Sequence, residues 1–461
     1  MKLVLLSGGS GKRLWPLSND ARSKQFLKVL QNKENKLESM VQRVWAQLEK
    51  TGLSDSAVIA TSKSQVDMIQ SQLENKASLI VEPTRRDTFP AVALASAYIY
   101  SVLGANEDEV VAILPVDPYV EDEFFNRVKD LEHIVKESQT ELALIGVNPT
   151  YPSSKYGYIV PESKTESNDY LSVSRFIEKP AEKDALDLIK HGALWNCGVF
   201  AFKLGYVLSI LKEKGLPIYF DELLANYDQL PKISFDYEVV EKTEKIVVLP
   251  YDGYWKDLGT WNTLTEEIAT EKIGKGAISE DSKNIHLINE LEIPITVLGA
   301  SDLIVAASPD GILVSDREAS PRIKEIVGEF ENRPMYEERR WGWYRVLDYT
   351  KIKGENKEVL TKRIGIDAGK NLSYQLHDFR DEVWTIIKGE GVFILNDTIH
   401  NVKPSDVLKI HAGDKHAIKA INDLEIIEVQ TGTQLIEEDI VRLFMDWEEI
   451  IGYVQGVNKQ S

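Results

Sequence analysis

Residues 1–18 read MKLVLLSGGSGKRLWPLS, and this stretch sets the expectation for the N-terminal fold. A short apolar run, KLVLLS, leads directly into a glycine-rich turn, as a buried strand leads into a phosphate-binding turn. Two common phosphate motifs are excluded. Leu6 and Arg13 break the P-loop pattern, and Leu14 stands where the dinucleotide pattern needs its third glycine. The turn therefore predicts a phosphate site of neither class.

The alternation that begins here continues to about residue 270. Short apolar runs alternate with longer amphipathic stretches, which predicts an α/β domain over 1–270 with a Rossmann-like, mostly parallel sheet and helices on both faces. Ligands of such sheets bind at the carboxyl ends of the strands, and the glycine turn lies at that edge. The expected strands are KLVLLS, SAVIAT, SLIVEP, VVAILPVD and LALIGV, and the expected helices are LESMVQRVWAQLEK, QVDMIQSQL and TFPAVALASAYIYSVL.

The remainder of the chain has a different pattern, in which short β runs are separated by polar turns. Residues 271–332 carry short β runs between polar turns and predict a small β-rich segment. Residues 333–344 are charged and contain Pro334, which predicts a linker. Residues 345–461 return to short strands and predict an antiparallel sandwich or small barrel, with a helix over EEDIVRLFMDWEEIIGYV packed on it.

Composition narrows the class of protein. With 54 Lys and Arg against 73 Asp and Glu, the net charge of −19 argues against a nucleic-acid or anionic-membrane surface. The single cysteine, Cys197, excludes an internal disulfide and a Cys-rich zinc site and fits a reducing compartment. The N-terminus lacks the features of a signal peptide, and no apolar run reaches bilayer length. We therefore expect a cytoplasmic protein without membrane or nucleic-acid partners.

Five islands of polar residues carry the chemistry of the first domain. Backbone N–H groups and cations at the glycine turn suit a polyphosphate, and two aspartates suit Mg²⁺. The islands are GGSGKRLWPLS with RSKQFL (Gly8, Gly9, Gly11, Lys12, Arg13, Lys24), EPTRRDTFPA (Glu82, Pro83), LPVDPYV (Asp117), FIEKP with WNCGVF (Glu178, Lys179, Asn196) and WKDLGTW (Asp257).

Together the islands predict phosphoryl or nucleotidyl transfer by positioning and charge neutralisation. No obvious nucleophile and no His base stand among them, so a sugar phosphate can itself be the nucleophile. Each island alone has a simpler explanation, because an Asp that ends a strand is more often a turn or cap residue, and Arg13 or Lys24 alone would be a surface charge. The joint occurrence of all five islands, in order, favours a functional site.

The same motifs resemble the mannose-1-phosphate guanylyltransferases, within the sugar nucleotidyltransferase superfamily. The resemblance rests on GGSGKRLWPLS, SKQFL, EPTRRDTFPAVALA, LPVDPYV, YGYI, FIEKP, WNCGVF, FDYEVVEKT and WKDLGTW, and it continues through the β-rich segment, for which it implies a β-helix-like fold. It implies that GTP and mannose 1-phosphate are the substrates. The implied roles are nucleotide binding for Gly8, Gly9, Gly11, Glu82 and Pro83, neutralisation of the triphosphate by Arg13 and Lys24, Mg²⁺ binding by Asp117 and Asp257, and sugar-phosphate binding by Glu178, Lys179 and Asn196.

Four positions depart from the family's usual pattern. Ser23 stands for Pro, Asp87 for Asn, Pro118 for His and Cys197 for Ser. Ser23 is expected to loosen the turn that presents Lys24, because serine restricts the backbone less than proline does. Asp87 adds a negative charge near the nucleotide. These changes leave the specificity for the nucleotide base and for the sugar open, but they do not change the expected reaction type.

The last domain contains a candidate metal site. Gln375 and His377 are two apart in an expected strand and face the same side, Glu382 lies on a strand expected to adjoin it, and AGDKHAIKAIN supplies His416. Two imidazoles, a carboxylate and an amide oxygen suit Zn²⁺, Mn²⁺ or Fe²⁺. The pattern resembles a cupin, specifically the phosphomannose isomerase half of bifunctional guanylyltransferases. It departs at 377–379 and Val383, where the family has further histidines, and at 411–413, where it has Pro-x-Gly.

Several alternatives remain open from the sequence. The transferase could use another base or another sugar 1-phosphate, such as a manno-heptose, or the chain could be a sugar-nucleotide-binding protein without catalysis. The cupin could be metal-free and structural, could bind metal, or could isomerise mannose 6-phosphate. The sequence does not fix the oligomeric state, and a homodimer is one option.

Overall fold

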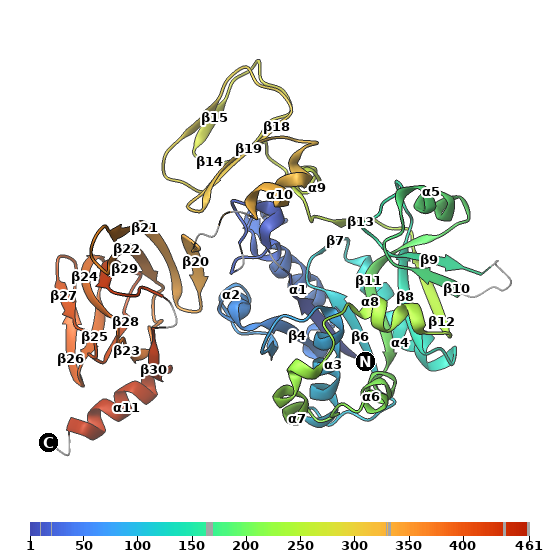
Figure 1. The fold of residues 1–461 in the computed structure, drawn as a ribbon, viewed down its shortest axis with the longest axis horizontal. Coiled ribbons are helices and arrows are strands. Elements are labelled where there is room, and N and C mark those ends of the chain that lie inside the picture. The colour runs from blue at the N-terminus through green and yellow to red at the C-terminus, as the bar shows by residue number, and fades with distance from the viewer. Residues whose placement is uncertain are drawn as a thin grey trace. The chain divides into compact units, whose positions relative to one another are not determined.

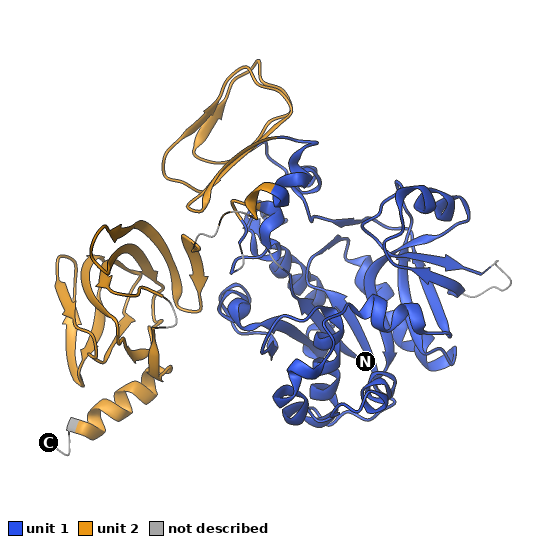
Figure 2. Cartoon of the chain, viewed as in Figure 1, with its two compact units in different colours: residues 1–14, 18–271, 316–325 blue, residues 15–17, 272–315, 326–461 orange. Residues whose placement is uncertain are grey.

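The structure is a computed structural model, which describes residues 1–461 except 10, 20, 163–168, 329, 331–332, 437–438 and 459–461. Two compact units are present (Figures 1 and 2). Unit 1 comprises residues 1–14, 18–271 and 316–325, and unit 2 comprises residues 15–17, 272–315 and 326–461. The predicted segment boundary at residue 332 lies outside the described residues.

Unit 1 is built on a nine-stranded sheet in the order β5-β4-β1-β6-β11-β8-β12-β10-β9. Strands β5, β4, β1 and β6 are parallel, as are β8 and β12, whereas β11 runs antiparallel to both β6 and β8. The predicted α/β class with a mostly parallel sheet is confirmed, because β11 and β10 are the strands of this sheet that run against the direction of the others. The reversed direction of β11 was not predicted, because an apolar run does not encode its direction. The strands are β1 (Lys2–Ser7), β4 (Ala57–Ser62), β5 (Ser78–Glu82), β6 (Val110–Pro115), β8 (Leu142–Val147), β9 (Tyr158–Pro161), β10 (Leu171–Ile177), β11 (Leu194–Lys203) and β12 (Ile246–Tyr251).

Helices cover both faces of this sheet (Figure 1), and each face has its own core. Because side chains alternate along a strand, Leu3 and Leu5 of β1 pack among residues of α1, α2, α4 and α5, while Val4 packs among residues of α3, α6, α7 and α8. The helices are α1 (Met40–Thr51), α2 (Val66–Gln72), α3 (Thr88–Ser101), α4 (Glu123–Glu137), α5 (Glu182–Lys190), α6 (Leu204–Glu213), α7 (Phe220–Ala225), α8 (Phe235–Glu238) and α9 (Trp261–Thr265).

Short elements at the carboxyl edge of the sheet position the candidate site. β7 (Pro118–Val120) pairs antiparallel with β13 (Trp255–Asp257), so that Asp257 lies opposite Pro118. This pairing brings the WKDLGTW island beside the end of β6, although the two are far apart in sequence. The other short elements are η1 (Gly11–Leu14), η2 (Lys24–Phe26), β2 (Leu30–Gln31), β3 (Leu37–Glu38), η3 (Ser54–Ser56), η4 (Lys63–Gln65), η5 (Tyr227–Gln229), η6 (Val240–Lys242) and η7 (Ser320–Arg322).

The first part of unit 2 is β-helix-like, as expected. β14, β16 and β18 form one column of parallel strands, and β15 pairs parallel with β17 in another, around a core that includes Leu287 and Val305. The strands are β14 (Lys272–Gly274), β15 (Gly276–Ile278), β16 (His286–Asn289), β17 (Ile295–Val297), β18 (Leu303–Ser308) and β19 (Gly311–Asp316), and α10 (Ile323–Val327) follows.

The second part of unit 2 is a two-sheet antiparallel barrel of the cupin type. One sheet has the order β20-β21-β22-β29-β24-β27 and the other β26-β25-β28-β23-β30, and both contribute to one core that includes Trp384 and Phe393. The elements are β20 (Tyr336–Arg339), β21 (Gly342–Ile352), β22 (Lys357–Ile366), β23 (Tyr374–Leu376), β24 (Arg380–Lys388), β25 (Gly391–Leu395), β26 (Thr398–Val402), β27 (Val407–Ile410), β28 (His416–Ala420), β29 (Leu424–Gly432), β30 (Val441–Phe444) and α11 (Trp447–Asn458).

Two segments of unit 2 differ from the sequence prediction. The linker predicted over 333–344 instead contains β20 and the start of β21, which pair at the edge of the six-stranded sheet, where a polar strand can face water. The predicted C-terminal helix begins only at Trp447, because residues 441–444 form β30 beside β23. A short run with alternating apolar residues fits either period, so the pattern alone does not separate the two structures. Residues 437–438 of that prediction lie outside the described part.

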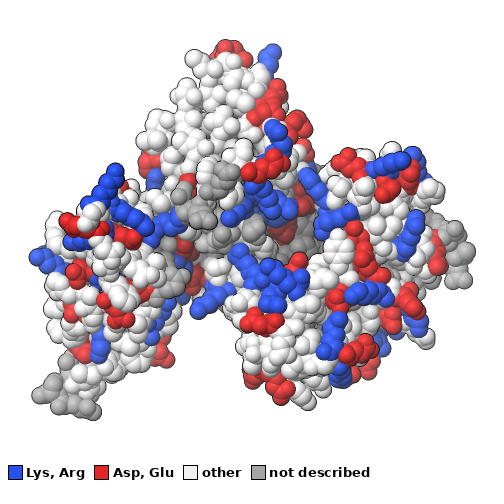
Figure 3. Space-filling model, viewed as in Figure 1, with Lys and Arg blue, Asp and Glu red and all other residues white. Residues whose placement is uncertain are grey.

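Charged side chains of both signs share the surface. On the face drawn in Figure 3, Lys and Arg are interspersed with Asp and Glu. Among the described residues, no helix combines the length and apolarity needed to span a membrane.

Candidate active site

The glycine turn after β1 is held in a conformation that needs its glycines. Gly9 has a φ of +126°, which residues with a side chain rarely adopt. A Cβ on Gly11 would lie 2.3 Å from the carbonyl oxygen of Asn19, so the turn packs directly on the backbone that precedes η2. The turn therefore combines an unusual backbone with close packing, at the carboxyl edge of the sheet as predicted.

Lys24 forms ion pairs with both predicted metal ligands, Asp117 and Asp257. Its Nζ lies 2.7 Å from an oxygen of Asp257 and 3.0 Å from an oxygen of Asp117. Burial alone would lower the pKa of Lys24, but the charges of Asp117 and Asp257 outweigh it and raise this pKa above its usual value. Burial likewise opposes the ionised form of Asp257, yet the charge of Lys24 lowers its pKa. Lys24 thus links the two carboxylates into one ion-paired cluster.

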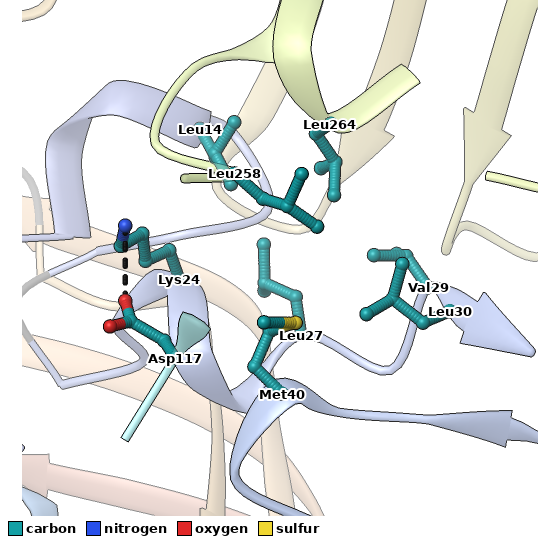
Figure 4. A pocket seen from close by; sticks show the side chains of 9 residues that line it. All are labelled: Leu14, Lys24, Leu27, Val29, Leu30, Met40, Asp117, Leu258 and Leu264. Carbon is teal, nitrogen blue, oxygen red and sulfur yellow. Dashed lines mark ion pairs between the residues drawn. The ribbon is translucent and has the colours of Figure 1, made fainter. Parts of the chain in front are cut away.

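Figure 4 shows the Lys24–Asp117 ion pair at one side of a small pocket whose other walls are apolar. The apolar lining comes from the end of η1, from the segment that follows η2 up to β2, from the start of α1, and from α9 and the loop before it. This packing supports the lysine on one side, so its ammonium is directed toward the two carboxylates. The lining residues are Leu14, Leu27, Val29, Leu30, Met40, Leu258 and Leu264.

An open cleft of about 570 Å³, solvent at its mouth included, lies beside the charged cluster. Tyr156 and Trp255 line it and belong to an aromatic group with Tyr151 and Trp195. Asn196 reaches the same cleft, which connects the predicted sugar site with the predicted metal ligands. The lining is Lys24, Pro115, Asp117, Pro118, Tyr156, Asn196, Cys197, Trp255 and Asp257.

The predicted sugar-phosphate residues lie in a hydrogen-bonded acidic cluster. Lys179 forms an ion pair with the buried Glu178. The amide of Asn196 donates to Asp236 at 2.7 Å, and its oxygen accepts from the Gly198 N–H at 3.0 Å, which fixes the orientation of the amide. Both bonds leave Asn196 in one rotamer at the wall of the cleft.

Asp236, from α8, was not identified from the sequence as a site residue. Burial and the nearby charge of Glu178 raise the pKa of Asp236 to about 7. A carboxyl group with this pKa can accept or donate a hydrogen bond near neutral pH. The motif FDYEVVEKT contained the residue, but only the three-dimensional contact with Asn196 reveals it.

The predicted nucleotide residues at the end of β5 occupy two environments. Glu82 is buried and accepts a hydrogen bond of 2.5 Å from the hydroxyl of Tyr227, while Pro83 is exposed in the loop that follows. Burial raises the pKa of Glu82 despite this bond. Asp87 has a φ of +73° and caps α3 through the Thr88 N–H at 2.7 Å, so this departure from the family pattern has a local structural role.

The other departures have simple structural outcomes. Pro118 begins β7 and lines the cleft. The thiol of Cys197 is buried and donates to the carbonyl of Ile145 at 3.2 Å, and burial raises the pKa of this thiol to about 12. Cys197 is therefore a protonated, unreactive wall residue.

The structure thus brings Lys24, Asp117, Asp257 and Asn196 together around one cleft. Glu178 and Lys179 join it through the Asn196–Asp236 contact, and the exposed Arg13 lies close enough for its charge to lower the pKa of Asp257. Glu82 and Pro83 do not line this cleft.

A second cluster lies inside the cupin. Ligand atoms of His377, Glu382 and His416 are all within 4.8 Å of one another, and the three side chains are buried. Nδ1 of His377 lies 2.6 Å from the carbonyl of Asp439, and Nδ1 of His416 lies 3.1 Å from that of Asp414. A carbonyl accepts, so both rings carry their proton on Nδ1 and direct an Nε2 lone pair into the cluster.

His416 Nε2 has no hydrogen-bond partner within the described residues. Burial lowers the pKa of His377 to about 4 and also lowers that of His416, so both rings are neutral, as metal ligands must be. These features fit a divalent metal held by two imidazoles and a carboxylate.

Two details of this cluster differ from expectation. Gln375 does not point an oxygen at the cluster, because Oε1 accepts from Ser373 at 2.6 Å and Nε2 faces His377 Nε2 at 3.4 Å. Glu382 belongs to the opposite sheet from β23, where Gln375 pairs with His416.

Arg380, which sequence reasoning missed, lies beside the cluster. Its Nε donates to Glu382 Oε1 at 2.9 Å, and its Nη2 lies 3.3 Å from His377 Nε2. The guanidinium neutralises Glu382 in this arrangement.

Comparisons with known proteins agree with this two-part organisation. Residues 2–272 match the nucleotidyl transferase family, and residues 331–445 match the mannose-6-phosphate isomerase C-terminal family. Over 472 residues the chain is 30% identical to a putative mannose-1-phosphate guanylyltransferase of Vibrio cholerae, covering 95% of this chain and 98% of that protein. It is 30% identical over 475 residues to the mannose-1-phosphate guanylyltransferase RfbM of Salmonella typhimurium, covering 95% and 96%.

A solved structure is similar over the first part of the chain. It is a Thermus thermophilus protein described as a mannose-1-phosphate geranyltransferase, with a TM-score of 0.60 and 29% identity, covering 72% of this chain and 99% of that one.

Proposed function

This chain belongs to the mannose-1-phosphate guanylyltransferase family and is a nucleotidyltransferase, and we propose that it joins GTP and α-D-mannose 1-phosphate to give GDP-mannose and diphosphate. The observation that carries the proposal is the Lys24–Asp117–Asp257 cluster beside a cleft that Asn196 also lines. A cation held between two carboxylates at the carboxyl edge of the sheet suits a reaction in which phosphate charge is redistributed.

We assign the following roles to the chain's own residues. The glycine turn binds the nucleotide, while Arg13 and Lys24 neutralise the triphosphate and the departing diphosphate. Lys179 and Asn196 hold the sugar 1-phosphate, and Glu178 orients Lys179. An oxygen of that phosphate attacks the α-phosphorus in line, the new P–O bond forms as the bond to the β-phosphate oxygen breaks, and diphosphate leaves.

Asp117 and Asp257 would hold a magnesium ion. Their carboxylate oxygens are the donors that Mg²⁺ prefers, and their shared contact with one ammonium brings both within reach of one cation. When bound, the ion supplies positive charge to the phosphates. In the substrate complex, Lys24 would pair with phosphate oxygens in place of the two carboxylates.

A substrate panel tests the proposal. The protein is incubated with Mg²⁺, each of four nucleoside triphosphates and several sugar 1-phosphates, and diphosphate release is measured. We expect turnover with GTP and mannose 1-phosphate. Strict turnover of another pair would support the alternative transferase. Nucleotide binding without any diphosphate, unchanged in Asp117→Ala and Asp257→Ala, would support the non-catalytic alternative.

For the cupin we propose a divalent metal site at His377, Glu382 and His416, with mannose-6-phosphate isomerase as a second activity. The unpartnered Nε2 of His416 and the Nδ1 bonds of both imidazoles favour a metal over a purely structural cupin. Zn²⁺, Mn²⁺ and Fe²⁺ are the candidate ions, and Gln375 would need a different rotamer to add an oxygen ligand. A coupled assay of fructose 6-phosphate to mannose 6-phosphate conversion, with and without added metal, tests the isomerase activity.

A further inference from the structure

Ser23 stands immediately before η2 and Lys24, where the family usually has proline, and it adopts a backbone conformation that proline could also adopt. Its φ is −71°, within the range that proline imposes, and the residue is only 1% exposed. The side chain of Ser23 also makes hydrogen bonds that a proline at this position could not make.

The Ser23 hydroxyl connects the glycine turn to a buried polar network. It donates to the carbonyl of Gly9 at 3.1 Å and accepts from Nε2 of Gln65 at 2.8 Å. Gln65 Oε1 accepts in turn from Ser7 at 3.0 Å, and Ser7 accepts from Nε2 of Gln25 at 3.1 Å. The donors and acceptors thus form one directed chain that ends on Gly9.

Each member of the network comes from an element that frames the turn. Ser7 ends β1, Gln65 ends η4 and Gln25 lies in η2 next to Lys24. The four polar side chains are at most 2% exposed, so no water replaces a lost partner without repacking. The network therefore transmits the rigidity of the sheet edge to one peptide of the glycine turn.

The position of this contact determines what it can affect. Gly9 has the left-handed φ of +126°, and a glycine peptide in such a turn rotates readily unless its carbonyl is held. With the carbonyl bonded to Ser23, the turn is ordered before the nucleotide arrives, and less conformational entropy is lost on binding.

We propose that the Ser23 hydroxyl is a positioning group for the nucleotide, which holds the Gly9 peptide through its hydrogen bond to the Gly9 carbonyl. This inference rests on the proposed function, because it assigns the glycine turn to nucleotide binding. Ser23 acts through Gly9 and does not itself contact the reacting phosphates.

Two variants separate the hydroxyl from the backbone conformation. Ser23→Ala removes the hydroxyl and leaves the backbone free. Ser23→Pro also removes the hydroxyl but fits the observed φ and keeps the conformation. Ser96→Ala is the matched control, because Ser96 is a fully buried serine whose hydroxyl donates to the carbonyl of Val92 at 2.8 Å within α3.

Steady-state kinetics in GTP and the dissociation constant of GTP without sugar phosphate are measured for each protein. We expect Ser23→Ala and Ser23→Pro each to raise the KM and the dissociation constant about 5- to 10-fold, which is the size of one buried neutral hydrogen bond, with kcat within about twofold. Ser96→Ala should leave both constants unchanged. The KM-against-kcat split distinguishes positioning from general destabilisation, which would lower the active fraction and hence the apparent kcat.

Two results would overturn the proposal. Unchanged nucleotide affinity in Ser23→Ala would show that the hydroxyl is not needed, and parent-like affinity in Ser23→Pro would show that the φ angle alone suffices. The parent's nucleotide is identified first. If it is not GTP, the same variants are compared with that nucleotide, so an error in the proposed base is detected separately from an error about Ser23.

Discussion

Replacing Lys24 by methionine removes the cation shared by Asp117 and Asp257 and keeps most of the side chain's volume. In the parent, Lys24 Nζ lies 2.7 and 3.0 Å from the two carboxylates, and the three side chains are 28%, 33% and 18% exposed for Lys24, Asp257 and Asp117. The substitution therefore leaves two partly buried negative charges side by side and also deletes a charge that faces the triphosphate.

The magnitude of the effect follows from these exposures. Exposed ion pairs contribute about 0–1 kcal/mol, and breaking a fully buried pair costs about 3–5 kcal/mol, so the partly buried cluster should lose about 1–3 kcal/mol of unfolding free energy. Loss of one charged donor to a transition state typically costs about 10²- to 10³-fold, and we expect this loss in kcat/KM. The unpaired carboxylates should also bind Mn²⁺ more tightly than the parent does without nucleotide.

Diphosphate release gives kcat/KM, and electron paramagnetic resonance of free Mn²⁺ gives the metal affinity. Lys12→Met is the matched control, since Lys12 has the same charge but lies in η1 and not in η2, and its kcat/KM should stay within about threefold of the parent. A Lys24→Met enzyme within threefold of the parent would refute the assignment. Equal losses in the two variants would instead indicate a general effect of positive charge near the turn.

Three further outcomes follow from particular contacts. The pKa of Asp236 is about 7 in the folded state and near 3.8 in the unfolded state. The folded state therefore holds an extra proton between these pH values, and the free energy of unfolding declines as the pH rises through them. Asp236→Asn should raise the free energy of unfolding in urea by about 1–3 kcal/mol at pH 8 and change it little below pH 4. Tyr227→Phe leaves buried Glu82 without its 2.5 Å donor and should cost about 1–3 kcal/mol in the same measurement, and an unchanged midpoint would contradict the role of this bond. Zn²⁺ should raise the thermal midpoint of the chain, Glu382→Gln should abolish the rise, and the exposed His411→Asn should retain it.

The pattern of apolar residues predicted the α/β class well, and the reason is visible in β1. Leu3, Val4 and Leu5 are all buried because the strand has helices on both faces, so a continuous apolar run is itself the signal. The direction of β11 and the strand at 441–444 were not predictable in this way. Strand direction depends on long-range pairing, and a four-residue run fits a helix or a strand.

The candidate site was predictable where the residue type itself indicates a chemical role. Lys24, Asp117 and Asp257 stand in polar islands at strand ends, and the structure brings their charged atoms together. Asp236 was missed because its role depends on a contact with Asn196, which lies 40 residues earlier in the sequence. Arg380 lies two residues from Glu382 on β24, but it was missed because an arginine is not a metal ligand. Ser23 was interpreted from its backbone preference alone, and the hydrogen bond to Gly9 lies outside what such a preference describes.

The substrate measurement tests the central claim most directly. Diphosphate release is followed with GTP and mannose 1-phosphate, in parallel with ATP, CTP and UTP and with glucose 1-phosphate and a manno-heptose 1-phosphate. The account predicts that GTP with mannose 1-phosphate gives the highest kcat/KM and that GDP-mannose accumulates in step with diphosphate. Selective turnover of a different pair, or no diphosphate from any pair in the presence of Mg²⁺, would contradict it.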